Sequence, residues 1–115
     1  MRLHHSGAVT YPLGQVIAFD AANGNWKVTD STVATVANAK AVLVAETVFT
    51  GSESGGIKLV RAVIGGKVDA DQLVFEGTDT LDTVPSGAAD SFRTQLRSYG
   101  IIAEELAQQR IEDNQ

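Results

Sequence analysis

The sequence predicts one mainly β domain with a minor helical part, a small β-barrel-like or β-tulip structure. Three observations indicate this fold class. The apolar residues fall in short runs rich in Val, Ile and Phe, which favour strands. Turn sequences containing Gly, Asn and Pro separate these runs. Clear helical spacing is confined to the last part of the chain, above all to residues 88–99.

Residues 1–14 are predicted to form a flexible N-terminal arm. Gly7, Pro12 and Gly14 interrupt isolated apolar residues, so no strand or helix period is sustained. Pro12 also disfavours helical backbone at Tyr11 and makes it extended. We expect this arm to become ordered only when a partner binds it.

Residues 15–29 are predicted to form a β-hairpin. The segment 15–19 contains Val16, Ile17 and Phe19, which are good strand formers. Asn23-Gly24 is a strong signal for a tight turn. After this turn, residues 26–29 alternate between apolar and polar and pair back on the first strand.

The centre of the chain predicts an antiparallel pair of strands. Residues 41–49 form a strongly apolar, β-branched run, which favours a buried strand. Residues 57–64 form a second such run after a glycine-rich turn. Gly65-Gly66 ends the second strand or marks a bulge, and residues 76–87 form a polar loop.

A helix is predicted over residues 88–99, where Phe92, Leu96 and Tyr99 recur on one helical face. Ser86 or Asp90 is expected to cap its start, and Gly100 to end it in the left-handed conformation. Ile101-Ile102 returns to an extended state, and a second short helix is predicted over 104–111. The predicted organisation is therefore an arm (1–14), one domain (15–102) and a C-terminal tail (103–115).

Composition excludes several classes of function. The 115 residues include no cysteine, which excludes disulfides and thiolate metal sites. The net charge is −5 and the nine basic residues are scattered, which argues against binding to nucleic acid or to an anionic membrane. No apolar stretch approaches the roughly 20 residues of a membrane span.

No arrangement of residues predicts catalysis, a cofactor or a metal. Both histidines, His4 and His5, fall in the predicted arm, away from any rigid element. Asp69 and Asp71 begin like a calcium-binding loop, but position 73 is Leu where a third oxygen ligand is needed. We therefore expect a protein that is not an enzyme, although the two aspartates leave a minimal acid–base enzyme as a rival hypothesis.

Four segments carry a resemblance to a known family through their order and spacing. They are residues 14–20 closed by Asn23-Gly24-Asn25-Trp26, then Ala41-Val42-Leu43-Val44-Ala45-Glu46, then Val63 with residues 66–73, and finally Leu96-Arg97-Ser98-Tyr99-Gly100-Ile101-Ile102. This set resembles the lambda-type head decoration proteins of tailed bacteriophages. The resemblance covers roughly residues 14–102. It departs from the family in the N-terminal segment and in the continuation from Ala103 to Gln115, where that family's chains commonly stop.

The resemblance implies a structural virion protein without catalytic activity. It implies a homotrimer at the three-fold and quasi-three-fold positions of the expanded capsid, holding the shell against internal DNA pressure. The implied partners are the major capsid protein and the chain itself, with no nucleic acid and no membrane. The implied location is the outer capsid surface, after synthesis in the cytoplasm of the bacterial host.

The residues expected to make these contacts fall in two groups. Val9, Tyr11 and Leu13 are the expected capsid contacts, because a strand-like arm can add to a partner's sheet edge. The expected trimer contacts are Trp26, Thr78, Leu81 and Pro85. The alternatives are a tail or head-completion β-protein of a phage and a small-ligand-binding β module, the latter disfavoured by an aromatic content of only 6%.

Overall fold

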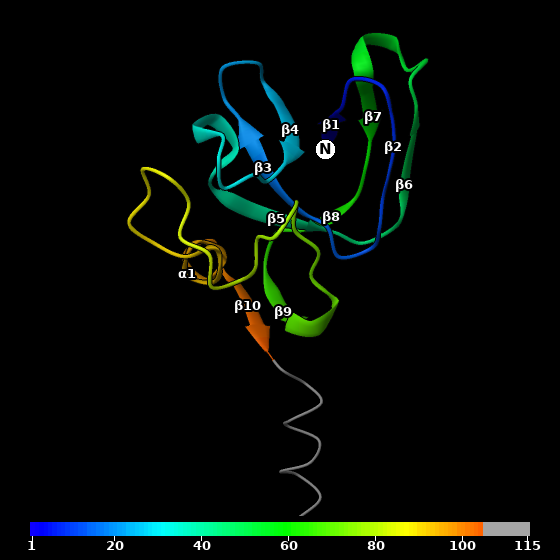
Figure 1. The fold of residues 1–115 in the computed structure, drawn as a ribbon. Helices are drawn as coiled ribbons and strands as arrows, with labels where there is room; N and C mark the ends of the chain where they lie inside the picture. The colour runs from blue at the N-terminus through cyan, green and yellow to red at the C-terminus, as the bar shows by residue number, and fades with distance from the viewer. Residues whose placement is uncertain (105–115) are drawn as a thin grey trace, which may run out of the picture.

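A computed structural model describes residues 1–104 as a mainly β fold with one α-helix, which confirms the predicted fold class (Figure 1). The helix α1 spans Phe92–Ser98 and begins after the long loop that follows the strands β1–β9. The strands are β1 (Arg2–His4), β2 (Ala8–Tyr11), β3 (Val16–Asp20), β4 (Asn25–Val28), β5 (Ala39–Leu43), β6 (Thr47–Thr50), β7 (Ile57–Leu59), β8 (Ala62–Val63), β9 (Gly66–Asp69) and β10 (Ile101–Glu104). Single 3-10 turns lie at Ala34–Val36, Ser54–Gly56 and Ala70–Gln72.

The main sheet curls until one segment of chain joins its two edges. The strand order is β7-β1-β4-β3-β5-β8, so the edge strands β7 and β8 are neighbours in sequence. The Val60 amide donates to the Met1 carbonyl at 2.9 Å, and the Val44 amide donates to the Arg61 carbonyl at 3.2 Å. Residues 57–63 thus contact both ends of the sheet, which gives the domain its barrel-like form (Figure 1).

The predicted N-terminal hairpin is confirmed. β3 and β4 pair antiparallel, with Phe19 opposite Trp26 and Asp20 opposite Asn25. Gly24 occupies the left-handed region, with φ at 68°, at the turn between them. The position of the turn and the antiparallel pairing of its two strands thus agree with the prediction.

The prediction of a separate arm over residues 1–14 is wrong. β1 lies inside the main sheet between β7 and β4, and β2 pairs with β6. The side chain of Leu3 is completely buried, and Tyr11 is 6% exposed. Two strands of three and four residues are too short to show a period, and their partners lie far along the chain.

The prediction of one continuous strand over residues 41–49 is also wrong. The chain bends at residues 44–46, which separates β5 in the main sheet from β6, whose partner is β2. The expected antiparallel pairing of this run with 57–64 holds only for β5 and β8, where Val42 lies opposite Val63. An apolar run does not reveal where it changes from one sheet to another.

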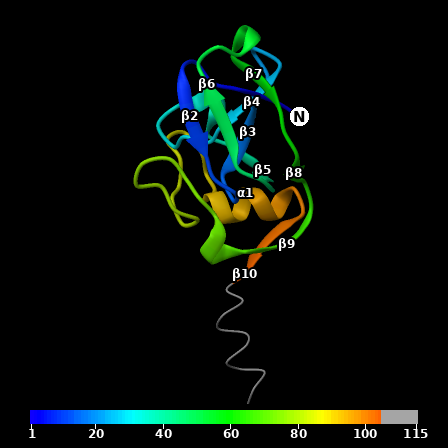
Figure 2. The same ribbon diagram turned by 90° about the vertical axis from the view of Figure 1, so that its right-hand side faces the viewer.

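Two hydrophobic clusters occupy the two faces of the central strands. In β3, Ile17 belongs to the first cluster and Val16 to the second, as the alternation of side chains along a strand requires. The first cluster lies inside the curl and contains Leu3, Tyr11, Ile17, Val28, Ala41, Leu43 and Phe49. The second lies between the sheet and α1 and contains Val16, Ala39, Val42, Leu81, Phe92, Leu96 and Ile101. Figure 2 shows α1 crossing the base of the sheet beside β10.

The helix is shorter than predicted and begins later. Its cap is Ser91, whose hydroxyl accepts from the Thr94 amide at 3.4 Å, and neither Ser86 nor Asp90 takes this role. Gly100 ends it with φ at 86°, as expected. Tyr99 is 48% exposed, whereas Gln95 is buried and accepts a hydrogen bond from the Ala39 amide at 2.8 Å.

The C-terminal predictions are tested only in part. Ile101 and Ile102 are extended in β10, as expected, and Glu104 belongs to the same strand and not to a helix. The rest of the predicted helix over 104–111 lies outside the described residues. Within residues 1–104, no helix has the length and apolar character needed to cross a membrane.

Candidate functional site

The three residues predicted to contact a capsid lie in different environments. Val9 is half-buried on β2, and Tyr11 packs against Phe49 with ring centroids 6.1 Å apart. Leu13 follows β2 and is 53% exposed. The packing of Tyr11 inside its own domain leaves Leu13 as the predicted contact that is most available to a partner.

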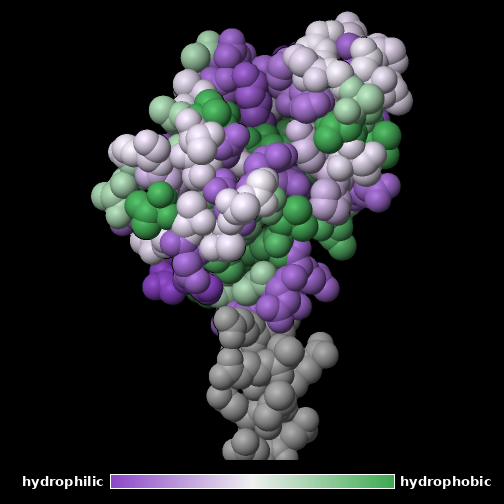
Figure 3. Space-filling view, viewed as in Figure 1, coloured by the Kyte–Doolittle hydropathy of each residue, from purple (hydrophilic) through white to green (hydrophobic). Residues whose placement is uncertain are grey.

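Leu13 forms one wall of an apolar groove of about 180 Å³. Val44, which is 41% exposed at the bend after β5, lies on the same groove. The lining residues are Leu13, Gly14, Val42, Leu43, Val44, Val63, Val68, Asp69, Gln72 and Leu73. Figure 3 shows hydrophobic side chains reaching the surface in the lower part of the domain, where Figure 1 places β8 and β9.

The wall that carries Leu13 is fixed by backbone hydrogen bonds on both sides. The Gly14 amide donates to the Leu43 carbonyl at 2.9 Å, and the Gly14 carbonyl accepts from the Val74 amide at 2.9 Å. A Cβ at position 14 would lie 1.9 Å from the Gln72 carbonyl oxygen, and φ is 93°, so the position requires glycine. The groove is therefore preformed, which lowers the ordering cost of binding.

The residues predicted to form a trimer interface are not gathered into one surface patch. Trp26 is half-buried on β4 beside Phe19, with ring centroids 5.4 Å apart. Leu81 is 8% exposed in the cluster under α1, and Pro85 is fully buried. Because both side chains pack inside the domain, their prediction as subunit contacts is corrected, whereas Thr78 is exposed and Trp26 keeps an accessible part.

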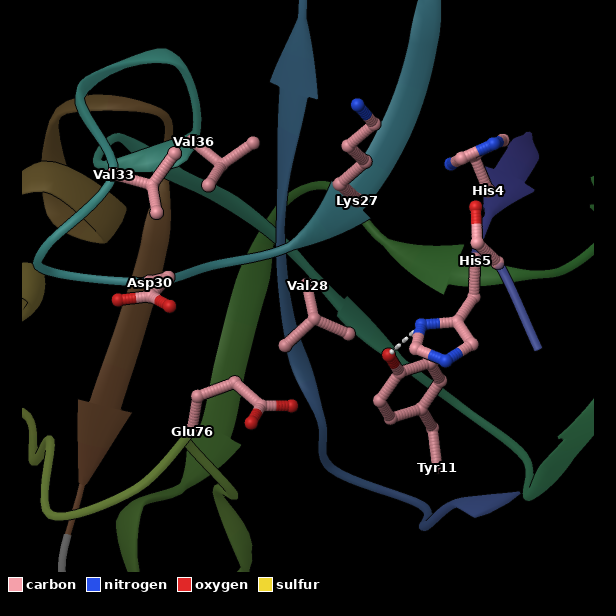
Figure 4. A pocket seen from close by; sticks show the side chains of 10 residues that line it. His4, His5, Tyr11, Lys27, Val28, Asp30, Val33, Val36 and Glu76 are labelled. Carbon is pink, nitrogen blue, oxygen red and sulfur yellow. Dashed lines mark hydrogen bonds between the residues drawn. The ribbon is translucent and has the colours of Figure 1, made fainter. Parts of the chain in front are cut away.

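A second hollow of about 370 Å³ opens between the N-terminal strands and the segment after β4 (Figure 4). Its lining combines polar and apolar side chains: His4, His5, Ser6, Tyr11, Lys27, Val28, Asp30, Val33, Val36 and Glu76. Lys27 is paired with the buried Asp20 carboxylate at 2.9 Å. In Figure 4 the Glu76 carboxylate points toward the side on which Tyr11 and His5 lie.

The Tyr11 hydroxyl in this hollow is hydrogen-bonded to His5 Nδ1 at 2.9 Å. Burial, together with the smaller effect of the negative charge of Glu76, raises the pKa of Tyr11 from 10.0 to about 12. The hydroxyl therefore stays protonated at neutral pH and serves as a hydrogen-bonding group, not as a base.

The change Tyr11→Phe is expected to reduce the alkaline loss of stability. A tyrosine whose pKa is higher in the folded state stabilises the fold below pH 10.0, and this contribution disappears as the pH rises to about 12. Urea denaturation across that interval should show the free energy of unfolding falling less steeply in the variant than in the wild type. Equal slopes would show that Tyr11 does not titrate differently in the two states.

The acidic residues around position 70 have a structural role. The Asp69 side chain accepts from the Asp71 amide at 3.0 Å and so caps the 3-10 turn at Ala70–Gln72. Among residues 1–104, no group of three or more His, Cys, Asp or Glu side chains is placed to hold a metal ion.

The groove was missed by sequence reasoning except for Leu13. Its other walls come from β5, β8, β9 and the turn after β9, and only the tertiary fold brings these together. No protein-family model, curated protein or solved structure matches this chain, and the groove and the hollow are therefore the features on which a function can rest.

Proposed function

We propose that this protein is a capsid decoration protein of a tailed bacteriophage. It binds the outer surface of the expanded head as a homotrimer at three-fold and quasi-three-fold positions. There it holds neighbouring copies of the major capsid protein together against the pressure of packaged DNA. The observation that carries this proposal is the preformed apolar groove, with Leu13 and Val44 exposed on its walls.

The groove fits a role in protein binding better than a role in chemistry. Its lining is mostly aliphatic, and the single carboxylate in it, Asp69, already caps a turn. Half-exposed aliphatic side chains on a rigid wall are suited to receive an apolar side chain of a partner. One such contact is weak. In a trimer, however, binding of one copy holds the other two close to their sites, and this high effective concentration makes the overall binding much stronger.

Stabilisation of the head then follows from differential binding. A ligand that binds one state of a lattice better than another stabilises the preferred state by mass action. If neighbouring capsid subunits present matching surfaces only after expansion, each bound trimer opposes the reverse transition. The acidic character of the chain, with a net charge of −5, suits a surface that does not contact DNA.

Co-sedimentation tests this proposal. The purified chain is mixed with expanded heads that lack it, taken from the same phage, and unexpanded heads serve as the control. We expect saturable pelleting with expanded heads alone, with bound copies in multiples of three per site. Absence of pelleting with both kinds of head would contradict the proposal and favour a tail or head-completion protein, which rings or tubes in electron micrographs would reveal.

A further inference from the structure

We propose that Asn23-Gly24, at the tip of the β3–β4 hairpin, is a site of spontaneous deamidation, and that hydrogen bonds to Asp20 slow this reaction in the folded protein. Both residues are exposed, and a Cβ on Gly24 would meet nothing within 4 Å. A glycine after asparagine leaves the backbone nitrogen open to reaction, because no side chain shields it. The site therefore combines solvent access with low steric hindrance.

The reaction needs only water. The backbone nitrogen of Gly24 attacks the side-chain carbonyl carbon of Asn23 and loses its proton as the new C–N bond forms. The side-chain amide leaves as ammonia, which gives a five-membered succinimide ring. Water then opens either carbonyl of the ring, which yields aspartate or isoaspartate at position 23 without any oxidant or second reactant.

Asp20 holds both of the groups that must move. The Asn23 side-chain nitrogen donates to the Asp20 carboxylate at 2.7 Å, so the amide is turned toward the hairpin. The Gly24 amide donates to the Asp20 carbonyl at 2.8 Å, which occupies the attacking nitrogen. Ring closure requires both hydrogen bonds to break first.

Asp20 is itself firmly held. Asp20 is only 1% exposed. Its carboxylate forms an ion pair with Lys27 at 2.9 Å and accepts a hydrogen bond from the Ala22 amide at 3.1 Å. The hydrogen bond from Asn23, followed by that from Lys27, lowers the pKa of Asp20 to about 2. The carboxylate is therefore charged at neutral pH, where it is a strong acceptor for the Asn23 amide.

Conversion at position 23 would disturb the hairpin beyond the tip. A carboxylate at 23 cannot donate to Asp20 and would repel it, since like charges in contact are unfavourable. An isoaspartate would also add a backbone carbon three residues before Trp26, whose ring packs on Phe19. The restraint by Asp20 thus protects the register of β3 and β4 over time.

The test compares deamidation rates of the full chain in native buffer and in urea, at the same mildly alkaline pH. The readout is the mass of the tryptic peptide that ends at Lys27. We expect native conversion to be slower by about tenfold or more, because two hydrogen bonds of ordinary strength must break. Equal rates in the two solutions, or no conversion in urea, would overturn the proposal.

Variants separate the restraint from a general effect of folding. Asp20→Ala removes the acceptor of the Asn23 side chain but keeps the backbone carbonyl that accepts from the Gly24 amide. Its native rate is therefore expected to lie clearly above the native wild-type rate and below the rate in urea, whereas Asp82→Ala, at an exposed carboxylate elsewhere, should leave the native rate unchanged. Asn23→Gln should abolish conversion, since its ring would have six members. A folded Asp20→Ala variant that deamidates as slowly as the wild type would contradict the role of Asp20. If that variant does not fold, the milder Asp20→Asn, whose uncharged side chain is a weaker acceptor for Asn23, should deamidate faster than the wild type, and an unchanged rate would contradict the role.

Discussion

Replacing Leu3 with Ala is expected to lower the free energy of unfolding by about 2–5 kcal/mol, the usual cost of truncating a buried leucine. Leu3 is completely buried in the cluster inside the curl, on a strand with a partner on either side. Two effects add up in this loss: less apolar surface is removed from water on folding, and the missing methyl groups leave a cavity in the core. Urea denaturation followed by circular dichroism measures it.

The exposed Thr10 on β2 provides the matched control for Leu3. Thr10→Ala should change the free energy of unfolding by no more than about 0.5 kcal/mol, as is usual for surface positions. If Leu3→Ala lowers the free energy of unfolding as little as Thr10→Ala does, the N-terminal residues do not belong to the folded core. That result would support the flexible arm predicted from the sequence.

A double variant, Leu13→Asp with Val44→Asp, is expected to weaken binding to expanded heads by about a hundredfold or more, because central apolar contacts dominate interface energy. Both side chains are exposed, at 53% and 41%, so the domain should remain folded. Quantitative co-sedimentation measures the loss.

Val33→Asp is the control for this double variant. Val33 is 43% exposed and lies on the polar hollow, away from the groove residues. We expect it to bind heads as the wild type does. If Val33→Asp loses binding to heads and the double variant keeps it, the capsid contact surface is the hollow and not the groove.

The parts of the fold that could be predicted are those specified by short-range signals. The hairpin depends on Asn23-Gly24 and alternating neighbours, and the helix end depends on Gly100. The parts that could not be predicted depend on distant partners. Leu3 is buried because β1 lies between β4 and β7 and its side chain packs in a cluster of residues far along the chain, and nothing near Leu3 in the sequence indicates this.

The same distinction applies to the candidate contacts. The sequence predicts Leu13 as a contact only as part of the N-terminal arm, and its side chain is 53% exposed although that arm belongs to the fold. Tyr11, Leu81 and Pro85 were expected at interfaces but are buried, since a sequence does not tell an interface from a core when both are apolar. The sequence predicts Val44 within a buried strand, but its side chain is 41% exposed on the wall of the groove.

Electron cryomicroscopy of expanded heads saturated with the chain tests the proposed function most directly. The account predicts density for three domains at each three-fold and quasi-three-fold position of the outer surface, with the Leu13–Val44 groove against the capsid. Density confined to the portal vertex or the tail, or bound domains whose groove faces solvent, would contradict it.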